Sequence, residues 1–204
     1  MQTKIITTII SWGNALLLAF TISLLISIFI VQPYTVSGSS MEPTLEGSDP
    51  LNEAKTADRV MVFKSSSKFG SEPKIGDVVI VDSQVEKTRT LKDDLLDNPL
   101  VGIFTNSNEE KKNWIKRVIA ISGDKVEFKN GNVYRNGEKL EESYIKEEMD
   151  VPFESLVIPE NHVFVLGDNR NNSSDSRDIG PVPVENVVGK VILRFYPFDK
   201  LEIF

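Results

Sequence analysis

The sequence predicts a mainly β fold, in which a single N-terminal transmembrane helix precedes a β-rich soluble domain. One observation behind this prediction is a run without charged residues, from Ile5 to Val31. Another is that the rest of the chain divides into short apolar runs separated by turn signals. Two Asn-Gly pairs within residues 125–140 are strong signals for tight hairpins. No helical pattern of similar strength occurs outside the first segment.

The charge-free run has the length of a membrane anchor. Its 27 residues measure about 40 Å as an α-helix, and a hydrocarbon core is about 30 Å thick. A cleaved secretory signal would have a shorter apolar region behind a basic start, whereas this start carries only Lys4. We therefore predict a short cytoplasmic N-terminus at residues 1–4, a retained anchor at 5–31 and an extracytoplasmic domain at 32–204. Lys4 and the amino terminus favour this orientation under the positive-inside rule.

The soluble domain contains several runs that are expected to form strands. Each is rich in apolar and β-branched residues and is bounded by turn residues. They occupy residues 58–63, 75–81, 113–121, 125–140, 162–168 and 187–197. The charged stretch at 83–112 lacks such patterning, and we predict a surface insertion there with a short helix near 91–96.

Composition excludes several classes of function. A net charge of −7 argues against nucleic acid as a partner, because phosphate binding needs clustered Lys and Arg. The absence of cysteine removes disulfides, thiolate nucleophiles and Cys-ligated zinc. A single histidine argues against a His-based metal site. No metal or cofactor is therefore expected.

The stretch SGSSMEPTL, residues 37–45, places three serines soon after the anchor. A serine hydroxyl needs a positioned base before it can act as a nucleophile. The one histidine, His162, lies at the entrance of an apolar strand, and nothing in the sequence completes a histidine triad around it. A lysine is the alternative base, since burial among apolar groups lowers the pKa of a lysine toward neutral pH.

Lys116 is the lysine with the most apolar surroundings. In a strand, the run WIKRVIA places Trp114, Lys116 and Val118 on one face. Lys190, in GKVILRF, is a competing candidate, and an edge-strand lysine that reaches water is the alternative reading of Lys116. The polar segment GDNRNNSSDSRDIG, residues 167–180, is either a capped turn or a loop that holds such a base in place.

Four ordered blocks resemble those of bacterial type I signal peptidases of the Gram-positive type (peptidase family S26). The blocks are SGSSMEPTL, IGDVVIV, IKRVIAISGD and GDNRNNSSDSRDIG. Members of this family are membrane-bound Ser-Lys serine endopeptidases that remove signal peptides from exported proteins. The resemblance implies a signal-peptidase-like catalytic domain outside the plasma membrane, without metal or cofactor. The implied partners are membrane lipid and the signal peptides of secretory preproteins, cleaved after small residues.

The resemblance also assigns the reacting groups. It implies that Ser40, the serine before Met in the first block, is the nucleophile, and that Lys116 is the general base. The backbone N–H of Ser40 would stabilise the oxyanion. Some members carry a second serine two residues before the nucleophile, where this chain has Gly38, so a second oxyanion donor is not identified. Met41 and residues 60–63 are candidate substrate contacts.

Five further residues are implied to support the site. The base-orienting serine of the family corresponds to Ser173, and its structurally important Asp and Arg correspond to Asp175 and Arg177. The resemblance also implies that Asp168 pairs with Arg117. This pair would tie the last block to the strand that carries the base.

Three other readings of the sequence remain open. A self-cleaving protein similar to LexA-type repressors would use the same chemistry, but such proteins carry a DNA-binding domain and no anchor. A specialised peptidase that matures pilins or other assembly partners would use the same residues. A catalytically idle, membrane-tethered binding module is a third possibility, although it need not retain all of these residue types.

Overall fold

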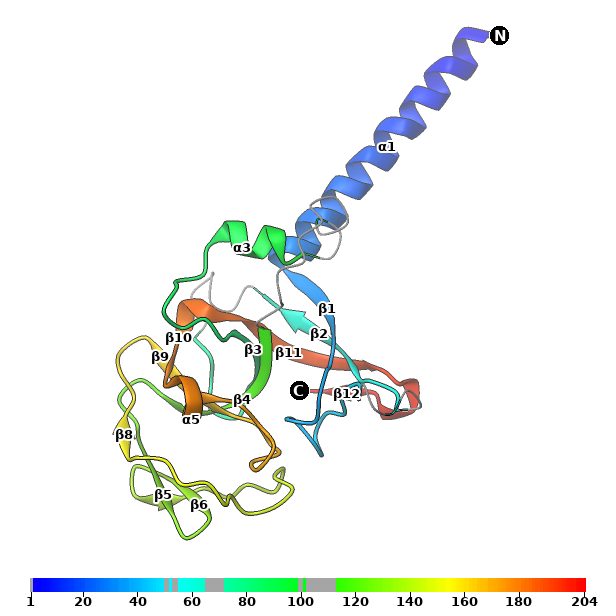
Figure 1. Cartoon of the computed structure of the whole chain (residues 1–204). Helices are drawn as coiled ribbons and strands as arrows, with labels where there is room; N and C mark the ends of the chain where they lie inside the picture. The colour runs from blue at the N-terminus through cyan, green and yellow to red at the C-terminus, as the bar shows by residue number, and fades with distance from the viewer. Residues whose placement is uncertain (1, 50–51, 53–54, 65–71, 99–100, 102–112) are drawn as a thin grey trace.

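The computed structural model describes residues 2–49, 52, 55–64, 72–98, 101 and 113–204. A long helix, α1 (Gln2–Phe29), projects from a β-rich domain, as Figure 1 shows. The mainly β fold with one N-terminal helix is thus confirmed. The part of α1 from Lys4 to Phe29 is long and apolar enough to cross a membrane. The helix ends earlier than the expected boundary at residue 31, because Val31 already begins a strand.

One antiparallel sheet forms the body of the domain. Its strand order is β1-β2-β11-β3-β4-β9-β10, and β12 pairs with β11. The strands are β1 (Val31–Thr35), β2 (Arg59–Phe63), β3 (Val78–Asp82), β4 (Asn113–Ile121), β9 (His162–Leu166), β10 (Val182–Pro183), β11 (Val187–Tyr196) and β12 (Glu202–Ile203). Strands β3, β4 and β9 are rich in Val and Ile, which favour a pleated and buried surface. Strand β4 therefore lies inside the sheet, between β3 and β9.

A smaller sheet has the order β7-β6-β5-β8. It consists of β5 (Lys125–Lys129), β6 (Asn132–Arg135), β7 (Glu138–Lys139) and β8 (Leu156–Val157). The two Asn-Gly pairs join β5 to β6 and β6 to β7, and all four residues have a positive φ. Two consecutive positive φ angles characterise the type I′ hairpin turn. The hairpins expected from these pairs are therefore present.

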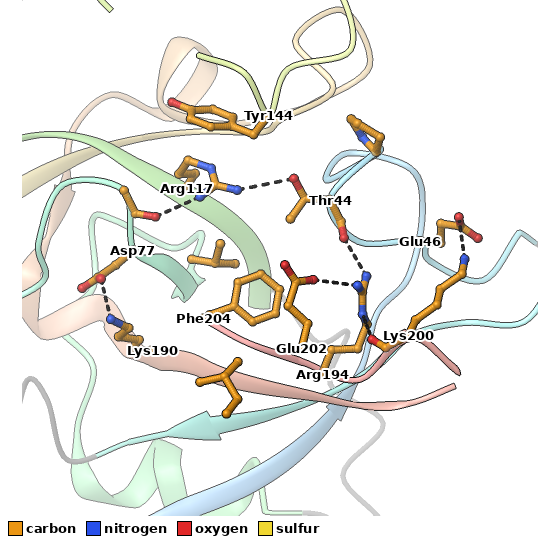
Figure 2. Close-up of a pocket in the computed structure, with 14 residues that line it drawn as sticks. Thr44, Glu46, Asp77, Arg117, Tyr144, Lys190, Arg194, Lys200, Glu202 and Phe204 are labelled. Carbon is orange, nitrogen blue, oxygen red and sulfur yellow. Dashed lines mark hydrogen bonds and ion pairs between the residues drawn. The ribbon is translucent and has the colours of Figure 1, made fainter. Parts of the chain in front are cut away.

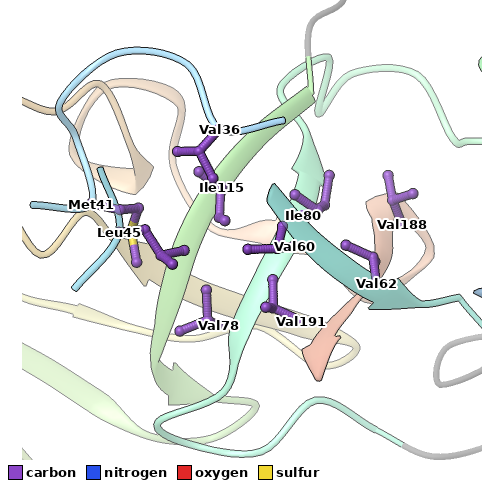
Figure 3. Close-up of a cluster of buried hydrophobic side chains, with 10 residues drawn as sticks. All are labelled: Val36, Met41, Leu45, Val60, Val62, Val78, Ile80, Ile115, Val188 and Val191. Atoms are coloured by element: carbon purple, nitrogen blue, oxygen red, sulfur yellow. The ribbon is translucent and has the colours of Figure 1, made fainter. Parts of the chain in front are cut away.

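Buried apolar side chains attach the segment that contains Ser40 to the main sheet. Met41 and Leu45 are 1% and 0% exposed. They pack in one hydrophobic cluster with residues of four strands (Figure 3). The cluster comprises Val36, Met41, Leu45, Val60, Val62, Val78, Ile80, Ile115, Val188 and Val191. The turn that contains Ser40 is thus fixed from beneath by its own apolar neighbours.

The expected insertion contains the predicted short helix. Helix α3 (Leu91–Leu96) lies where sequence patterning placed it, and residues 99–100 and 102–112 lie outside the described residues. The segment before α3 is not merely a surface excursion, because the side chain of Arg89 is only 3% exposed. Its guanidinium pairs with Asp82, Asp94 and Asp97 at 3.2, 3.0 and 2.5 Å. These ion pairs fix α3 against the end of β3.

The remaining helices assigned within the described residues are short. They are α5 (Ser176–Ile179), η1 (Val184–Asn186) and η2 (Phe198–Lys200). Asp175 is the N-cap residue of α5, and its side chain accepts a hydrogen bond from the backbone N–H of Arg177. Asp is a favoured N-cap residue for this reason. The polar block after β9 therefore folds as a capped turn.

Two valines of the smaller sheet provide a test of where its stability comes from. Val133 on β6 is 0% exposed, whereas Val157 on β8 is 60% exposed. We expect Val133→Ala to lower the free energy of unfolding by about 1.5–2.5 kcal/mol, because it removes two buried methyl groups and leaves a cavity. The matched variant Val157→Ala should cost less than about 0.5 kcal/mol. Urea unfolding of the full chain in detergent measures both, and equal effects would contradict this core.

Candidate active site

The central contact of the site joins the first and third sequence blocks. The amine Nζ of Lys116, on β4, donates a hydrogen bond of 2.9 Å to Oγ of Ser40. It donates a second bond of 2.9 Å to the carbonyl oxygen of Ile115, and it lies 5.7 Å from the ring centroid of Trp114. The amine is therefore aimed at the serine by its own strand. A lysine in this position is a geometrically suitable base for the Ser40 hydroxyl.

The environment of Lys116 favours its neutral form. Lys116 is only 3% exposed, and this burial lowers the pKa of its amine from 10.5 to about 8. The carboxylates of Asp175 and Asp168 act in the opposite direction, and Arg177 lowers the pKa further. Desolvation penalises the ammonium ion because the ion loses its hydration. With a pKa of about 8, roughly a tenth of the amine is neutral at pH 7, far more than for a lysine in water.

The turn that carries Ser40 is held by the polar block after β9. The backbone N–H of Asn169 donates to the carbonyl oxygen of Ser40 at 3.0 Å, and its side-chain amide donates to the carbonyl oxygen of Ser39 at 3.0 Å. The amide of Asn172 donates to Oγ of Ser39 at 2.7 Å. No motif in the sequence distinguishes either asparagine. Their only signal was their place in a segment rich in Asn and Asp.

The structure brings Asp168 and Arg117 together. Asp168 is fully buried, and its two carboxylate oxygens accept from Nε and Nη2 of Arg117 at 2.9 and 2.7 Å. Bidentate pairs of this kind are strong and geometrically specific. The hydroxyl of Thr44 also donates to Asp168 at 2.5 Å. The pair therefore connects β4, the polar block and the nucleophile turn.

Asp175 and Arg177 form the second ion pair of the site. The carboxylate of Asp175 is 0% exposed and accepts from Nε of Arg177 at 2.8 Å. It also accepts from the backbone N–H of Gly167 at 3.0 Å, and Arg177 donates to the carbonyl oxygen of Ser173 at 3.1 Å. These bonds fix the loop beside Lys116. Together with the Asp168–Arg117 pair, they place an arginine next to each of the two carboxylates that raise the pKa of Lys116.

Ser173 lies in the same cleft as Ser40 and Lys116, which has a volume of about 460 Å³. Its hydroxyl donates to the carbonyl oxygen of Ser174 at 3.5 Å, whereas the amine of Lys116 donates to Ser40 and to Ile115. A side chain at Gly167 would collide with the Ser173 hydroxyl and with the Ser40 carbonyl. Glycine at this position therefore lets the loop approach the nucleophile. A base-orienting role for Ser173 stays a prediction.

The candidate substrate contacts divide into two groups. Met41 is buried in the hydrophobic cluster (Figure 3) and lines neither of the two clefts that reach Ser40. Val60 lines a narrower cleft of about 130 Å³ that also reaches Ser40 and Lys116. The same cleft is lined by Tyr34, Val36, Ser37, Ile80, Trp114 and Ile115, among others. One wall of this cleft is the end of β1 with the residues that follow it, and the other wall is the start of β4.

The two competing bases are engaged elsewhere. Ring atom Nδ1 of His162 lies 2.7 Å from the carbonyl oxygen of Glu160. Lys190 donates to Asp77 at 2.6 Å, and its side chain is 33% exposed. Among the residues that the structure describes, no three His, Cys, Asp or Glu side chains are arranged to hold a metal ion. Of these three candidate bases, Lys116 is the one that contacts Ser40.

A larger cavity lies on the other side of Arg117 and has a volume of about 600 Å³ (Figure 2). Its basic side chains are engaged in ion pairs: Lys190 with Asp77, Arg194 with Glu202 and Lys200 with Glu46. The guanidinium of Arg117 stacks on the ring of Tyr144, with its Cζ atom 4.0 Å from the ring centroid. This cavity contains neither Ser40 nor Lys116, and both residues line the two smaller clefts instead.

Comparison with known proteins assigns the family. Residues 9–196 match the family model described as signal peptidase, peptidase S26. The chain belongs to this family of serine endopeptidases. A probable signal peptidase I-1 of Synechocystis sp. is 34% identical over 91% of this chain and 81% of its own length. Signal peptidase IB of Staphylococcus aureus (strain COL) is 34% identical over 95% and 93% of the two chains. The resemblance to bacterial type I signal peptidases is thereby confirmed.

Other relatives match over different lengths. A thylakoidal processing peptidase 1 of Arabidopsis thaliana is 35% identical over 93% of this chain, which spans only 49% of that relative. A crystal structure of a signal peptidase I from Enterococcus faecalis is 24% identical, with a TM-score of 0.40 over 58% of this chain and 96% of that one. This structural likeness is too low to carry an argument. The family assignment rests on sequence.

The pKa of Lys116 predicts a pH-dependent peptidase activity. Because only the neutral amine accepts the serine proton, activity should fall as the pH decreases below about 8, the pKa of this group. The loss should approach roughly tenfold for each further pH unit. We would measure kcat/KM for a peptide substrate against pH in detergent. A flat profile down to about pH 5 would contradict a lysine base of this kind.

Arg177 should tune this pH profile through its charge. Without the guanidinium, the carboxylate of Asp175 would raise the pKa of Lys116 unopposed. We therefore expect Arg177→Met to move the acidic limb of the profile to higher pH. Arg135→Met is the control, because Arg135 contacts the carbonyl oxygen of Ile119 on β4 and does not contribute to the Lys116 shift. A drop in rate with an unmoved limb would refute this electrostatic role.

Proposed function

We propose that this chain is a membrane-bound serine endopeptidase that cleaves N-terminal signal peptides from exported preproteins. The reaction would use a Ser40–Lys116 dyad and would proceed through an acyl-enzyme. The observation that carries the proposal is the 2.9 Å hydrogen bond between a buried lysine and Ser40. Membership of the signal peptidase family supports the choice of substrate.

The proposed reaction has two steps that share one base. Neutral Lys116 removes the proton from Ser40 Oγ, and the oxygen attacks the scissile carbonyl carbon to form a tetrahedral intermediate. The protonated lysine then donates its proton to the leaving amine, which departs with the mature protein. In the second step, Lys116 deprotonates a water molecule that attacks the ester carbon, and the protonated lysine then returns the proton to Ser40 Oγ as the signal peptide leaves. The buried site keeps the pKa of the base close to the working pH.

Stabilisation of the oxyanion is assigned to the backbone of the nucleophile. Among the described residues, the N–H of Ser40 has no hydrogen-bond acceptor, so it is available to a substrate oxygen. Asn169 holds the carbonyl oxygens of Ser39 and Ser40, which fixes the orientation of the intervening peptide group. A single donor of this type contributes roughly 3 kcal/mol to catalysis. Gly38 supplies no side-chain donor, so the backbone has the larger share here.

The narrow cleft supports a preference for small side chains before the cut. Its volume of about 130 Å³ suits one or two small residues better than an aromatic ring. Residues 34–37 and 113–116 form its two walls, and both segments run extended. An extended substrate between such segments gains affinity from backbone hydrogen bonds, and the cleft adds the choice of side chain. Ser173, Asp175, Arg177, Asp168 and Arg117 would keep the base and the nucleophile in register.

The anchor places the reaction at a membrane surface. A helix long and apolar enough to span the bilayer leads directly into β1. With Lys4 and the amino terminus on the cytoplasmic side, the catalytic domain would lie outside the plasma membrane. The cleavage regions of exported preproteins emerge on that side. Membrane lipid and preproteins are thus the proposed partners, without metal or cofactor.

Cleavage of a purified preprotein by the full chain in detergent tests this proposal. We expect the wild type to cut after a small residue, and Ser40→Ala and Lys116→Ala to be inactive but folded. Lys116→Arg should also fail, because arginine stays protonated. Lys190→Ala is the matched control and should retain activity, since its amine pairs with Asp77. Near-normal cleavage by Ser40→Ala would refute the dyad, and an inactive wild type would favour a dedicated maturase or a binding module.

A further inference from the structure

The last turn of α1 is built into the catalytic domain without a linker. The helix ends at Phe29 and β1 begins at Val31. All side chains of α1 from residue 4 to residue 23 are exposed, whereas Ile28 is only 3% exposed. Figure 1 shows α1 standing on the domain as a straight helix, with α3 beside its base. The end of the anchor is therefore part of the domain's packing.

A buried lysine closes this junction. Lys64 follows β2 and is 0% exposed. Its amine donates to the carbonyl oxygen of Ile28 at 3.2 Å and to Oε1 of Gln32 at 2.6 Å, and its backbone N–H donates to Ile30 at 2.8 Å. The last carbonyl groups of a helix lack intrahelical partners, and a cationic side chain is favourable there. Lys64 thus caps α1 and ties it to both β1 and β2.

The two residues that follow α3 contribute a second set of contacts. The side-chain amide of Asn98, which is 0% exposed, donates to Oγ of Ser27 at 3.0 Å. The amide of Gln32 donates to the carbonyl oxygen of Asp97 at 3.4 Å. We call Lys64, Gln32 and Asn98, with their partners on α1, the junction clamp. Because the clamp joins α1 to two strands and to α3, it restrains rotation of the helix as well as its tilt.

The packing around Lys64 leaves little room for adjustment. A side chain at Gly189 on β11 would collide with the carbonyl oxygen of Phe63 and would lie 3.0 Å from Cα of Lys64. Strand β11 therefore lies directly against the end of β2. Unpaired helix carbonyls at the edge of the hydrocarbon core are costly, so loosening the clamp is unfavourable. A stiff junction follows from these two constraints.

We propose that the junction clamp fixes the height and tilt of the catalytic domain on the bilayer, and thereby selects which peptide bond of a membrane-inserted signal peptide reaches Ser40. The inference rests on the proposed function. Strand β1 is only five residues long, and Ser40 follows it closely. The position of the anchor is thus transmitted to the nucleophile through a short, sheet-bonded path. Lys64 is a positioning residue, because it acts through the anchor and does not touch the substrate.

Two substrates separate this role from a role in folding or chemistry. Full-length Lys64→Met would be reconstituted in lipid vesicles beside Lys200→Met, whose lysine pairs with Glu46 at the surface. A short soluble peptide that spans the cleavage site should be cut by both variants within about twofold of the wild-type rate. A preprotein inserted in the same vesicles should be cut about tenfold more slowly by Lys64→Met alone. Its products should show several neighbouring cut sites by mass spectrometry.

A distance measurement tests the clamp without any substrate. The chain has no cysteine, so Leu17→Cys and Glu185→Cys introduce a unique pair of spin labels, one on α1 and one on the exposed surface of η1. Pulsed electron paramagnetic resonance should give a narrow distance distribution for the otherwise unchanged chain in vesicles. Lys64→Met should broaden that distribution, and Lys200→Met should not.

The outcomes are distinguishable. A narrow distribution together with one unchanged cut site in Lys64→Met would overturn the proposal, as would equal losses with both substrates. If Lys64→Met does not fold, Asn98→Ala removes the α3 contact and is held to the same criteria. If the wild type cleaves neither substrate, the proposed function fails, and the distance distribution still decides whether the clamp is rigid.

Discussion

The rest of the site depends on the desolvation of one amine. A lysine in water has a pKa near 10.4 and would almost always be protonated at neutral pH. Burial of Lys116 on β4 lowers its pKa to about 8, so the charged form is destabilised by roughly 3 kcal/mol relative to its stability in water. A central strand is required for this effect, because an edge strand would leave the amine open to water.

The carboxylates near the lysine would cancel this effect if they stood alone. Asp168 and Asp175 both raise the pKa of Lys116, yet each is paired with an arginine on the same site. The two ion pairs hold the turn and the loop through hydrogen bonds. Each pair has no net charge, so the electrostatic effect of the pair on Lys116 is smaller than that of its carboxylate alone. Structural support and a neutral base are thus compatible because positive and negative charges are introduced together.

Side-chain hydrogen bonds also hold the part of the domain that joins the anchor. The anchor, the first strand and the turn that carries Ser40 follow one another along the chain, and hydrogen bonds from polar side chains close the two junctions between them. At one end Lys64 and Asn98 hold the helix, and at the other Asn169 and Asn172 hold the turn. A chain built in this way fixes the position of Ser40 with respect to the helix axis.

By itself the sequence determined the elements of this protein: the anchor from its missing charges, the hairpins from their Asn-Gly pairs and the apolar face of Lys116 from its period of two. The nucleophile came only from resemblance, since three serines were equivalent by local pattern. Only the tertiary structure decided that Lys116 rather than Lys190 meets Ser40, placed Met41 in the core, and revealed Asn169 and Lys64. The physical reason is that burial and hydrogen bonding depend on strands distant in the chain, as in the 76-residue separation of Ser40 and Lys116, which local patterns do not encode.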